Sequence, residues 1–458
     1  MKFYIKHIGL ALLIATFLSS CSKSYLTTSS YDGVVLDVAI TSESDLYTAL
    51  QGVYNGLFSY LGFGRYLPAK GDIMGDNVYC SYVSSGRQNS TYNVYTFTAS
   101  SGEHTSIWPQ LYKVIKRANQ IIAADLASST DVDEYKGEAY AARALSYLEL
   151  VRNFAYPYSY GSSNPGVPLV TDFFSSDIKP ARNTIAEVYA QVISDLEQAY
   201  SLITEYTSDA YISKYAVKAI EARVYMDMAD WSDAKTAALD VVNNGGFSLV
   251  SSTSYVSWWA AQSAESSDKQ EAIFSLVPTT SSNNGNESLD YLYYQGGGYG
   301  DYLVTDELYN LYSSTDVRKD LIEKTVRGTD SIYASVKYSN AATYTDNVPV
   351  IRYSEVLLIL AEAYYNTSDD ANALLYLNEV AEARDPSFTG YTSTGTQILE
   401  DILTEKRKEL AFEGNRFWDL YRLQRSFTKV VEQTLGTTLS ISLPTTVGSR
   451  FPIPQSEI

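Results

Sequence analysis

The segments AVKAIEARVYMDMADWSDAKTAALDVV (residues 216–242) and VLLILAEAYYNTSDDANALLYLNEVAEA (residues 356–383) carry one pattern twice. The residues they share are Ala222, Tyr225 and Ala234 in the first segment and, each 139 positions later, Ala361, Tyr364 and Ala373 in the second. Small residues at these positions let two antiparallel helices approach closely, and the tyrosine can fill the groove between neighbouring pairs. Each segment is therefore predicted to be a helix, a short turn and a second helix.

This spacing resembles the tetratricopeptide helix hairpin, and Ala144 with Tyr147 repeats the first half of the pattern. Apolar residues recur with helical period in further stretches. The helices expected from period and capping residues cover residues 46–57, 108–126, 134–154, 184–203, 213–229, 231–242, 353–365, 371–384 and 398–425. The sequence predicts a mostly α fold of about four stacked helix pairs, interrupted by large irregular loop insertions.

Charge and length exclude several classes of protein. The chain has 458 residues, enough for a large core, and a formal net charge of −19. Without the first twenty residues, which include Lys2 and Lys6 and no acid, the charge is −21. A chain this acidic is a poor binder of nucleic acid through general electrostatics.

The rare residues exclude common metal and catalytic sites. The histidines are His7 and His104, and the cysteines are Cys21 and Cys80. A Cys₂His₂ or Cys₄ zinc site needs more ligands than the mature chain would have, so we expect no metal and no cofactor. A Ser-His-Asp triad would have to use His104, which we expect in a loop without a partner motif. Cys80 is expected to be packed and inert.

The N-terminus is expected to be an export signal. A basic start is followed by the apolar run Ile8–Leu18, which is too short to span a bilayer but suits a signal peptide. Residues 18–21 (LSSC) resemble a bacterial lipobox, in which Cys21 becomes the acylated first residue. The alternative is ordinary secretory cleavage beside a chance cysteine. We expect lipidation at Cys21, because position and flanking residues both fit, and a polar tether follows over 22–34.

The unusual composition lies in the insertions. The chain has 41 tyrosines, and they are dense among Gly, Ser and Asn in Gly62–Gly102 and Gly245–Tyr302. The stretch GGGYG (residues 296–300) must be a turn, and it lacks the lysine and helix cap of a phosphate-binding loop. Aromatic rings stack on sugar faces while Asp, Asn and Arg bind hydroxyls. The alternative is that most of these rings pack inside the loops, which we favour for any single tyrosine.

Five strings stand out by their specific order of residues: Glu405–Arg422 (EKRKELAFEGNRFWDLYR), Phe451–Gln455 (FPIPQ), Ile351–Val356 (IRYSEV), Arg143–Tyr147 (RALSY) and Asn164–Val170 (NPGVPLV). Together they resemble the SusD/RagB family of outer-membrane nutrient-uptake lipoproteins. The resemblance covers nearly the whole mature chain and includes the lipobox. It implies a tetratricopeptide-like scaffold, anchored to the outer membrane and facing the cell exterior. It further implies a SusC-like TonB-dependent β-barrel transporter as partner, with oligosaccharide captured for import.

This resemblance divides the chain into a signal peptide at 1–20, the lipidated cysteine and tether at 21–40, and one SusD-like domain at 41–458. The ligand-binding insertions would be about 59–107 and 244–350. Because RagB-type members are linked to peptides, the ligand class is left open between glycan and peptide.

Ligand contacts in the family lie in loops that match Gly75–Ser100 and Val250–Tyr302 here. The residues we expect to bind carbohydrate are Asp76, Asn77, Arg87 and Tyr82 in the first stretch and Trp259, Tyr293, Tyr294 and Tyr299 in the second. If the second stretch is extended, Tyr291 and Tyr293 share one face and Tyr294 takes the other.

The pair Glu409 and Glu413 is the remaining candidate for catalysis. Carboxylates at i and i+4 share a helix face and could serve as the acid and base of a glycoside hydrolase. We favour a buried ion network with Arg407, Arg416 and Arg422, because the flanking residues have the character of a core. We therefore expect a binding protein and not an enzyme.

Overall fold

The structure is a computed structural model, and it describes residues 40–81, 90–100, 102–172, 179–204, 206–296, 298–340 and 342–457. Cys21 and the predicted signal peptide lie outside the described residues. Within the part that is described, no helix is long and apolar enough to cross a membrane.

The two repeated segments form matching helix pairs. Helices α8 (Lys214–Met228) and α9 (Trp231–Asn244) match α13 (Tyr353–Asn366) and α14 (Asp370–Arg384). The turns match as well: Ala229 and Ser368 both have left-handed backbone conformations, with φ of 58° and 62°. The next residues, Asp230 and Asp369, cap the second helix of each pair through their side chains. The repeat therefore extends from the helix interface to the turn.

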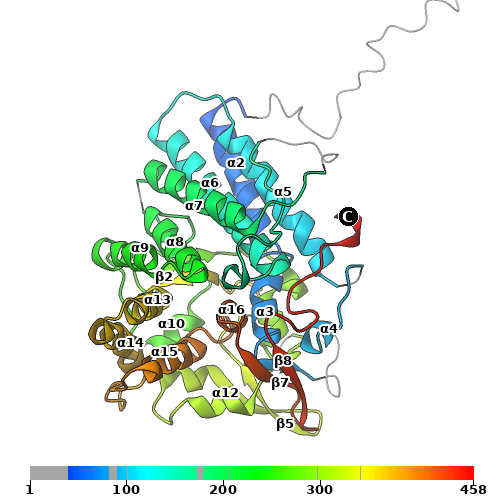
Figure 1. The fold of residues 1–458 in the computed structure, drawn as a ribbon, viewed down its shortest axis with the longest axis vertical. Helices are drawn as coiled ribbons and strands as arrows, with labels where there is room; N and C mark the ends of the chain where they lie inside the picture. Colours follow the sequence, from blue (N-terminus) through cyan, green and yellow to red (C-terminus); the bar gives the residue numbers. More distant parts are fainter. Residues whose placement is uncertain are drawn as a thin grey trace, which may run out of the picture.

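Eight helices in the described part of the chain form a continuous stack of four pairs. These helices are α2 (Glu43–Phe58), α5 (His104–Ile122), α6 (Thr130–Phe154), α7 (Ile185–Leu202), α8, α9, α13 and α14. Successive helices pack on one another from α5 to α9, α13 packs on α9, and α15 (Thr396–Glu409) packs on α13 and α14. Figure 1 shows the arc they make, from α2 at the top past α9 at the left to α14 and α15 at the lower left. The predicted helical-repeat scaffold is confirmed.

Alanines line the contacts within the repeated pairs. Ala222, Ala234, Ala361 and Ala373 have no exposed surface, which lets the helices approach closely. The repeat tyrosines lie nearer the surface, and the ring of Tyr364 stacks on Tyr376 with centroids 5.6 Å apart.

The insertions contain more regular structure than the sequence predicted. The first holds α3 (Tyr66–Ile73), β1 (Val78–Cys80) and α4 (Ser90–Asn93). The elements of the second are α10 (Tyr255–Ala260), β2 (Ala272–Leu276), η4 (Gly285–Glu287), α11 (Leu289–Tyr293), β3 (Tyr302–Val304), α12 (Asp306–Leu311), η5 (Val317–Leu321), β4 (Ile322–Arg327), β5 (Asp330–Ser335) and β6 (Val348–Arg352). Short helices and strands satisfy the backbone hydrogen bonds that an irregular buried loop would leave unpaired.

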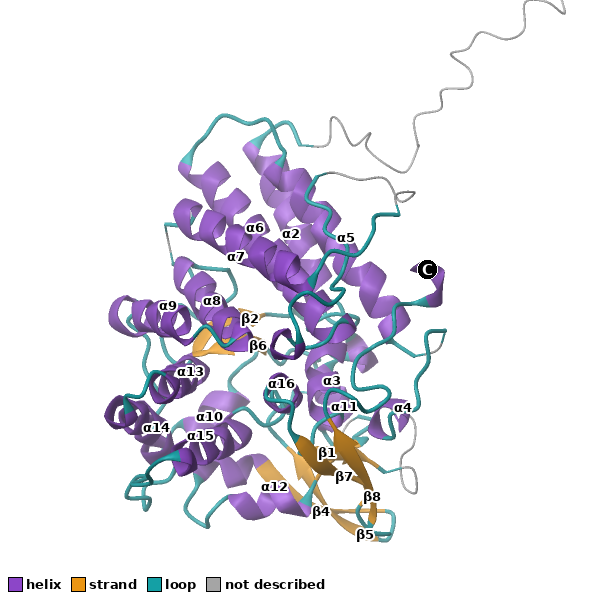
Figure 2. Cartoon of the chain, viewed as in Figure 1, coloured by secondary structure: helices purple, strands orange, loops and turns teal. Residues whose placement is uncertain are grey.

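One antiparallel sheet joins the two insertions. Its strand order is β1-β3-β5-β4, so β1 of the first insertion pairs with β3 of the second. Two further sheets are pairs, β2 with β6 and, after the last helix α16 (Arg416–Arg422), β7 (Ser426–Glu432) with β8 (Thr437–Ser442). Figure 2 shows β1, β4, β5, β7 and β8 gathered at the lower right, away from the repeat helices. The insertions thus form a second body of structure against the stack.

The segment at 398–425 contains two helices, α15 and α16, and the turn between them explains its glycine. Gly414 has a φ of 80°, and a Cβ there would lie 2.4 Å from the Cα of Pro68 in α3. Only glycine permits both the left-handed conformation and this close approach.

Candidate functional site

Three tyrosines of the second insertion form a partly exposed aromatic cluster, which we call the tyrosine ledge. The ring of Tyr291 meets Tyr299 edge-on, with centroids 4.9 Å apart, and Tyr344 at 5.9 Å. All three side chains are half-buried. A cluster of this kind offers stiff aromatic surface that loses little entropy when it binds a ligand.

The loop that carries Tyr299 is held in place by Arg327 at the end of β4. The guanidinium donates to the carbonyls of Tyr299 and Gly300 at 3.0 and 2.7 Å and pairs with Asp301 at 2.8 Å. Gly298 fits against the backbone of Tyr291, where a Cβ would lie 2.2 Å from the carbonyl oxygen. The contacts of Arg327 and the close packing at Gly298 therefore fix the position of Tyr299 relative to Tyr291.

The short helix η4 fixes Tyr344. The Tyr344 hydroxyl donates to Asn286 at 3.0 Å, Asn284 donates to the carbonyl of Phe58 at 2.9 Å, and Glu287 pairs with Arg65. Tyr344 itself has a φ of 57°, unusual for a residue with a side chain. A strained residue held by such contacts is often found at a binding site.

A cavity of about 710 Å³ adjoins the ledge, because Thr343 and Thr345 on either side of Tyr344 line it. The cavity lies between α2 and the second insertion. The residues that line it are Gln51, Tyr54, Asn55, Phe58, Ala210, Tyr211, Ser263, Ala264, Glu265, Leu276, Val277, Pro278, Thr279, Thr280, Ser282, Thr343 and Thr345. Hydroxyls, amides and aromatic rings dominate this wall, and its size suits a ligand of several sugar rings.

A buried pair of carboxyl groups lies under the ledge. Asp290 precedes Tyr291, and Asp346 lies two residues after Tyr344; both side chains are buried. Burial raises the pKa of Asp346 to about 7, and the carboxyl of Asp290 beside it adds to the rise. One oxygen of Asp290 has no donor among the other described residues, so a protonated Asp346 would satisfy it. The pair ties the two ledge segments together when it holds a proton.

Four of the predicted ligand residues lie near the surface or outside the described part. Tyr299 belongs to the ledge, and Tyr294 is half-buried, with its ring over Gly296. Tyr82 and Arg87 lie outside the described residues. These four remain predictions.

The expectation that Asp76 and Asn77 bind hydroxyls is wrong for this structure, since both side chains are buried in an ion network. Asp76 accepts from Arg416 at 2.7 Å, and Asn77 accepts from Arg407 at 2.8 Å. Burial alone would raise the pKa of Asp76, but the positive charges of Arg416 and Arg407 hold this pKa at about 2. These residues attach the first insertion to the C-terminal helices.

The expectation that Trp259 and Tyr293 form ligand platforms is also wrong for this structure, because both side chains are buried. Trp259 is 1% exposed and Tyr293 has no exposed surface. The Tyr293 hydroxyl donates to the buried Asp72. The stretch at 289–293 is helical and not extended, so Tyr291 and Tyr293 do not share a face, and Tyr291 is the ring that reaches the surface.

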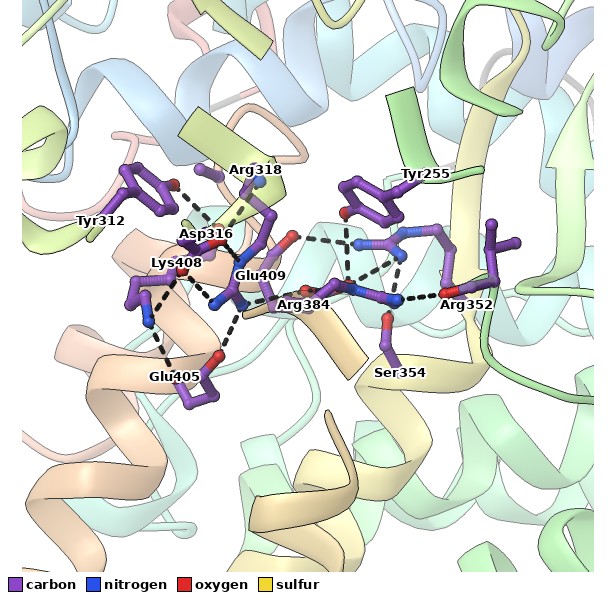
Figure 3. A network of polar contacts seen from close by, with 12 residues as sticks. Tyr255, Tyr312, Asp316, Arg318, Arg352, Ser354, Arg384, Glu405, Lys408 and Glu409 are labelled. Carbon is purple, nitrogen blue, oxygen red and sulfur yellow. Dashed lines mark hydrogen bonds and ion pairs between the residues drawn. The ribbon is translucent and has the colours of Figure 1, made fainter. Parts of the chain in front are cut away.

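Glu409 and Glu413 are buried in an ion network, as expected, but with other partners. Glu409 contacts Arg318, Arg352 and Arg384 at 3.1, 3.2 and 3.0 Å, as Figure 3 shows. Glu413 pairs with Lys337 and Arg352. Burial would raise the pKa of Glu409, but the three arginines hold it well below its usual range. Neither group is placed to exchange protons with a ligand.

The arginines predicted to pair with Glu409 and Glu413 pair with other carboxylates instead. Arg422, for example, pairs with Glu362 and Asp419. His104 is also not a loop residue. It is the first residue of α5, it is fully buried, and its ring stacks on Phe451 at 4.9 Å.

The sequence analysis missed Tyr344 and the cavity wall. Tyr344 lies in an unremarkable polar stretch, AATYTDN (residues 341–347), without periodicity. The cavity residues come from segments near 51–58, 210, 263–282 and 343–345, which only the fold brings together.

The fold and this site define a helical-repeat protein whose insertions carry a partly exposed aromatic cluster beside a cavity. Two family models match the chain: "SusD family" over residues 318–458 and "Starch-binding associating with outer membrane" over residues 25–226. The chain belongs to the SusD/RagB family.

Individual relatives are distant but cover most of the chain. SusD-like protein P2 of Formosa agariphila is 26% identical and covers 83% of this chain and 84% of its own. A putative sugar binding protein of Bacteroides vulgatus has the same fold, with a TM-score of 0.83, 29% identity, and 92% of this chain and 97% of its own covered. A laminarin binding SusD-like protein shares the fold at a TM-score of 0.72 and 21% identity, covering 91% of this chain and 97% of its own.

Proposed function

We propose that this protein captures oligosaccharide at the cell surface, without cleaving it, and delivers it to a SusC-like TonB-dependent transporter in the outer membrane. The ligand would lie across the tyrosine ledge, formed by Tyr291, Tyr299 and Tyr344, and enter the adjoining cavity. The family match supports oligosaccharide as the ligand, because one of the two matching models is described as starch-binding.

The observation that carries the proposal is the ledge beside a cavity whose wall combines apolar side chains with hydroxyls and amides. A sugar has apolar C–H faces and a rim of hydroxyls, so it needs both rings to stack on and groups that exchange hydrogen bonds. The cavity wall offers the amides of Gln51 and Asn55 and several serine and threonine hydroxyls as such groups.

The non-catalytic part of the proposal rests on the placement of carboxylates. Glycoside hydrolysis ordinarily needs two of them on either side of the bond, a few ångströms apart. Among the described residues that line the cavity, Glu265 is the only carboxylate. Glu409 and Glu413 are committed to arginine and lysine partners. A purified sample incubated with a glycan that it binds should generate no new reducing ends.

Anchoring and transport are inferred from the sequence and the family. An acylated Cys21 would hold the protein at the membrane, and residues 22–40 would let the folded part reach a barrel beside it. Peptide capture by the same fold is the competing function.

The test is calorimetry on residues 22–458 with a panel of neutral oligosaccharides and of short peptides. Replacing a true stacking ring by alanine should weaken glycan binding by about 1–3 kcal/mol, by analogy with base stacking on aromatic residues. The variants are Tyr291→Ala, Tyr299→Ala and Tyr344→Ala, and the matched control is Tyr160→Ala, an exposed tyrosine (44%) on η3 (Tyr158–Tyr160).

Binding of peptides alone would favour the competing function. Glycan binding that survives all three substitutions would place the site elsewhere. A melting temperature measured for each variant separates lost contacts from lost stability, since a packed ring would lower the melting temperature instead.

A further inference from the structure

A second cavity lies on the helical scaffold and not in the insertions. Its volume is about 320 Å³, and it lies where the N-terminal turns of α2 and α6 meet the segment before α8. Figure 1 shows α2 and α6 together at the upper end of the stack. The volume is within the range of cavities that hold small ligands, so the cavity is large enough for a further part of the glycan.

The two cavities meet at Tyr211, a half-buried residue that lines both. Its ring packs edge-on against Tyr54 of the first cavity, with centroids 5.8 Å apart. The Tyr54 hydroxyl donates to Glu138 of the second cavity and accepts from the backbone N–H of Ile212 at 2.8 Å. The boundary is thus one ring held by its neighbours, and a ligand that extends along the first cavity meets the second beyond this ring.

The second cavity has an aromatic platform of its own, formed by Tyr47 and Tyr135. Their ring centroids lie 5.4 Å apart, and the ring planes are inclined by 48°. Tyr47 is 40% exposed and Tyr135 is half-buried, so both rings keep surface that a ligand can cover. The platform therefore offers the same kind of stiff aromatic surface as the tyrosine ledge.

This platform is built on capped helix ends. Ser42 caps α2 and Ser129 caps α6, their side chains accepting from the backbone N–H groups of Asp45 and Val132. The Ser129 hydroxyl also donates to Glu43 at 3.0 Å, which ties the first turns of the two helices together. Binding groups carried by packed helices are held more precisely than groups carried by loops.

Polar groups surround the platform. The hydroxyls of Thr130 and Thr207 and the carboxylate of Asp131 belong to exposed residues of the lining. Such groups exchange hydrogen bonds with the hydroxyls of a sugar, whose apolar C–H faces can cover the rings. Rings and hydrogen-bonding groups thus occur together here, as they do at the ledge and the first cavity.

We propose that the second cavity is a further glycan subsite, so that a chain stacked on the ledge runs through the first cavity, passes Tyr211 and ends against Tyr47 and Tyr135. This inference rests on the proposed function and names its ligand class: oligosaccharides long enough to touch both platforms. Because one chain joins the two contacts, the second contact forms within the complex and adds to the affinity of the first.

The test measures affinity against chain length, by calorimetry on residues 22–458. The probes are laminari-, malto-, xylo- and manno-oligosaccharides of two, four, six and eight units. With a series that binds, affinity for the natural protein should keep rising toward the longest chain. Tyr47→Ala and Tyr135→Ala should each weaken binding of the longest chain about tenfold, and leave the shortest chain that binds at its original affinity.

Two further variants serve as controls. Tyr47→Phe keeps the ring and should bind the longest chain as the natural protein does. Tyr200→Ala removes an exposed tyrosine (36%) of α7 that lines neither cavity, and it should change affinity at no chain length. A melting temperature for each variant shows whether a loss of affinity comes with a loss of stability.

The outcomes separate the two proposals. If Tyr291→Ala weakens chains of every length while Tyr47→Ala and Tyr135→Ala weaken none, the second subsite is overturned and capture at the ledge stands. Equal losses for short and long chains in Tyr47→Ala also overturn the subsite, because a short chain on the ledge does not reach this ring. Binding of no probe contradicts both proposals.

Discussion

Glu409 contacts three buried arginines that come from different parts of the chain. The arginines around it come from η5, from the end of β6 and from the end of α14. Glu271 shares two of them, Arg352 and Arg384. Because all these side chains are removed from water, each charge depends on its neighbours for compensation.

Replacing Glu409 by glutamine should lower the free energy of unfolding by about 3–5 kcal/mol, since it leaves buried arginines without compensation. The control is Glu400→Gln, which breaks an exposed pair with Arg425 and should cost less than about 1 kcal/mol. Urea unfolding monitored by circular dichroism measures both. Equal effects would mean that the network contributes no more than a surface pair.

Asp346 predicts a pH dependence. Its folded pKa of about 7 exceeds the ordinary 3.8, so the folded state holds more protons than the unfolded state between these values. Stability from this group is therefore present at low pH and is lost as pH rises toward 7. Asp346→Asn keeps a donor toward Asp290 but removes the titrating carboxyl group. The free energy of unfolding of this variant, relative to that of the natural protein, should therefore rise as the pH is raised from 5 to 8.

Unfolding at both pH values measures the change, with each unit of pKa difference worth about 1.4 kcal/mol. A stability difference that does not move with pH would contradict the assignment of the proton to this pair.

At this scale the sequence could predict kinds of residue but not their exposure. Tyrosine in a glycine-rich insertion indicated aromatic binding surface, and Tyr299 lies on the ledge. Tyr293 and Trp259 looked the same in sequence and are core, because the turn of α11 and the packing of α10 decide which ring faces outward. The partners of Glu409 come from segments 25 to 91 positions away and could not be read from the helix alone.

At the scale of elements, the scaffold follows from local rules and the insertions do not. The helix period, the capping residues and the repeated turn predicted the ends of α7 and α9 to within two residues, whereas α5 begins and ends four residues before its predicted bounds. The strands of the insertions are three to six residues long. Strands β1, β2, β3 and β6 pair across long stretches of sequence, so no local pattern marks them, whereas β4 and β5 form a hairpin through a turn at Gly328 and Thr329. The site lies in the part that local rules describe least.

The loop of Tyr299 depends on Gly298. In Gly298→Ala the new methyl group would meet the Tyr291 carbonyl oxygen, so the loop must shift and glycan affinity should fall about tenfold or more. The control is Gly52→Ala in α2, where nothing lies within 4 Å and alanine should stabilise the helix by about 0.5–1 kcal/mol. Calorimetry with the best neutral glycan gives the affinities. Unchanged binding in Gly298→Ala would show that the ledge tolerates movement of this loop.

At the scale of the whole molecule, anchoring should depend on a single thiol. Cys21→Ala should release the protein from the membrane fraction, since no described helix can span a bilayer. Cys80→Ala, which alters a buried residue of β1, is the control and should remain membrane-bound. Immunoblots of soluble and membrane fractions measure both. A Cys21 variant that stays fully membrane-bound would contradict lipid anchoring.

The ion network also has a consequence for how the protein is made. Arg318, Arg352 and Arg384 leave the ribosome before Glu409 and Glu413 do, and Asp76 long before Arg407 and Arg416. A partly made chain therefore carries charges that its interior cannot yet neutralise, and it gains little by collapsing early. We expect a prematurely terminated copy to remain open and exposed to proteases, because the last helices supply the charges that its interior lacks.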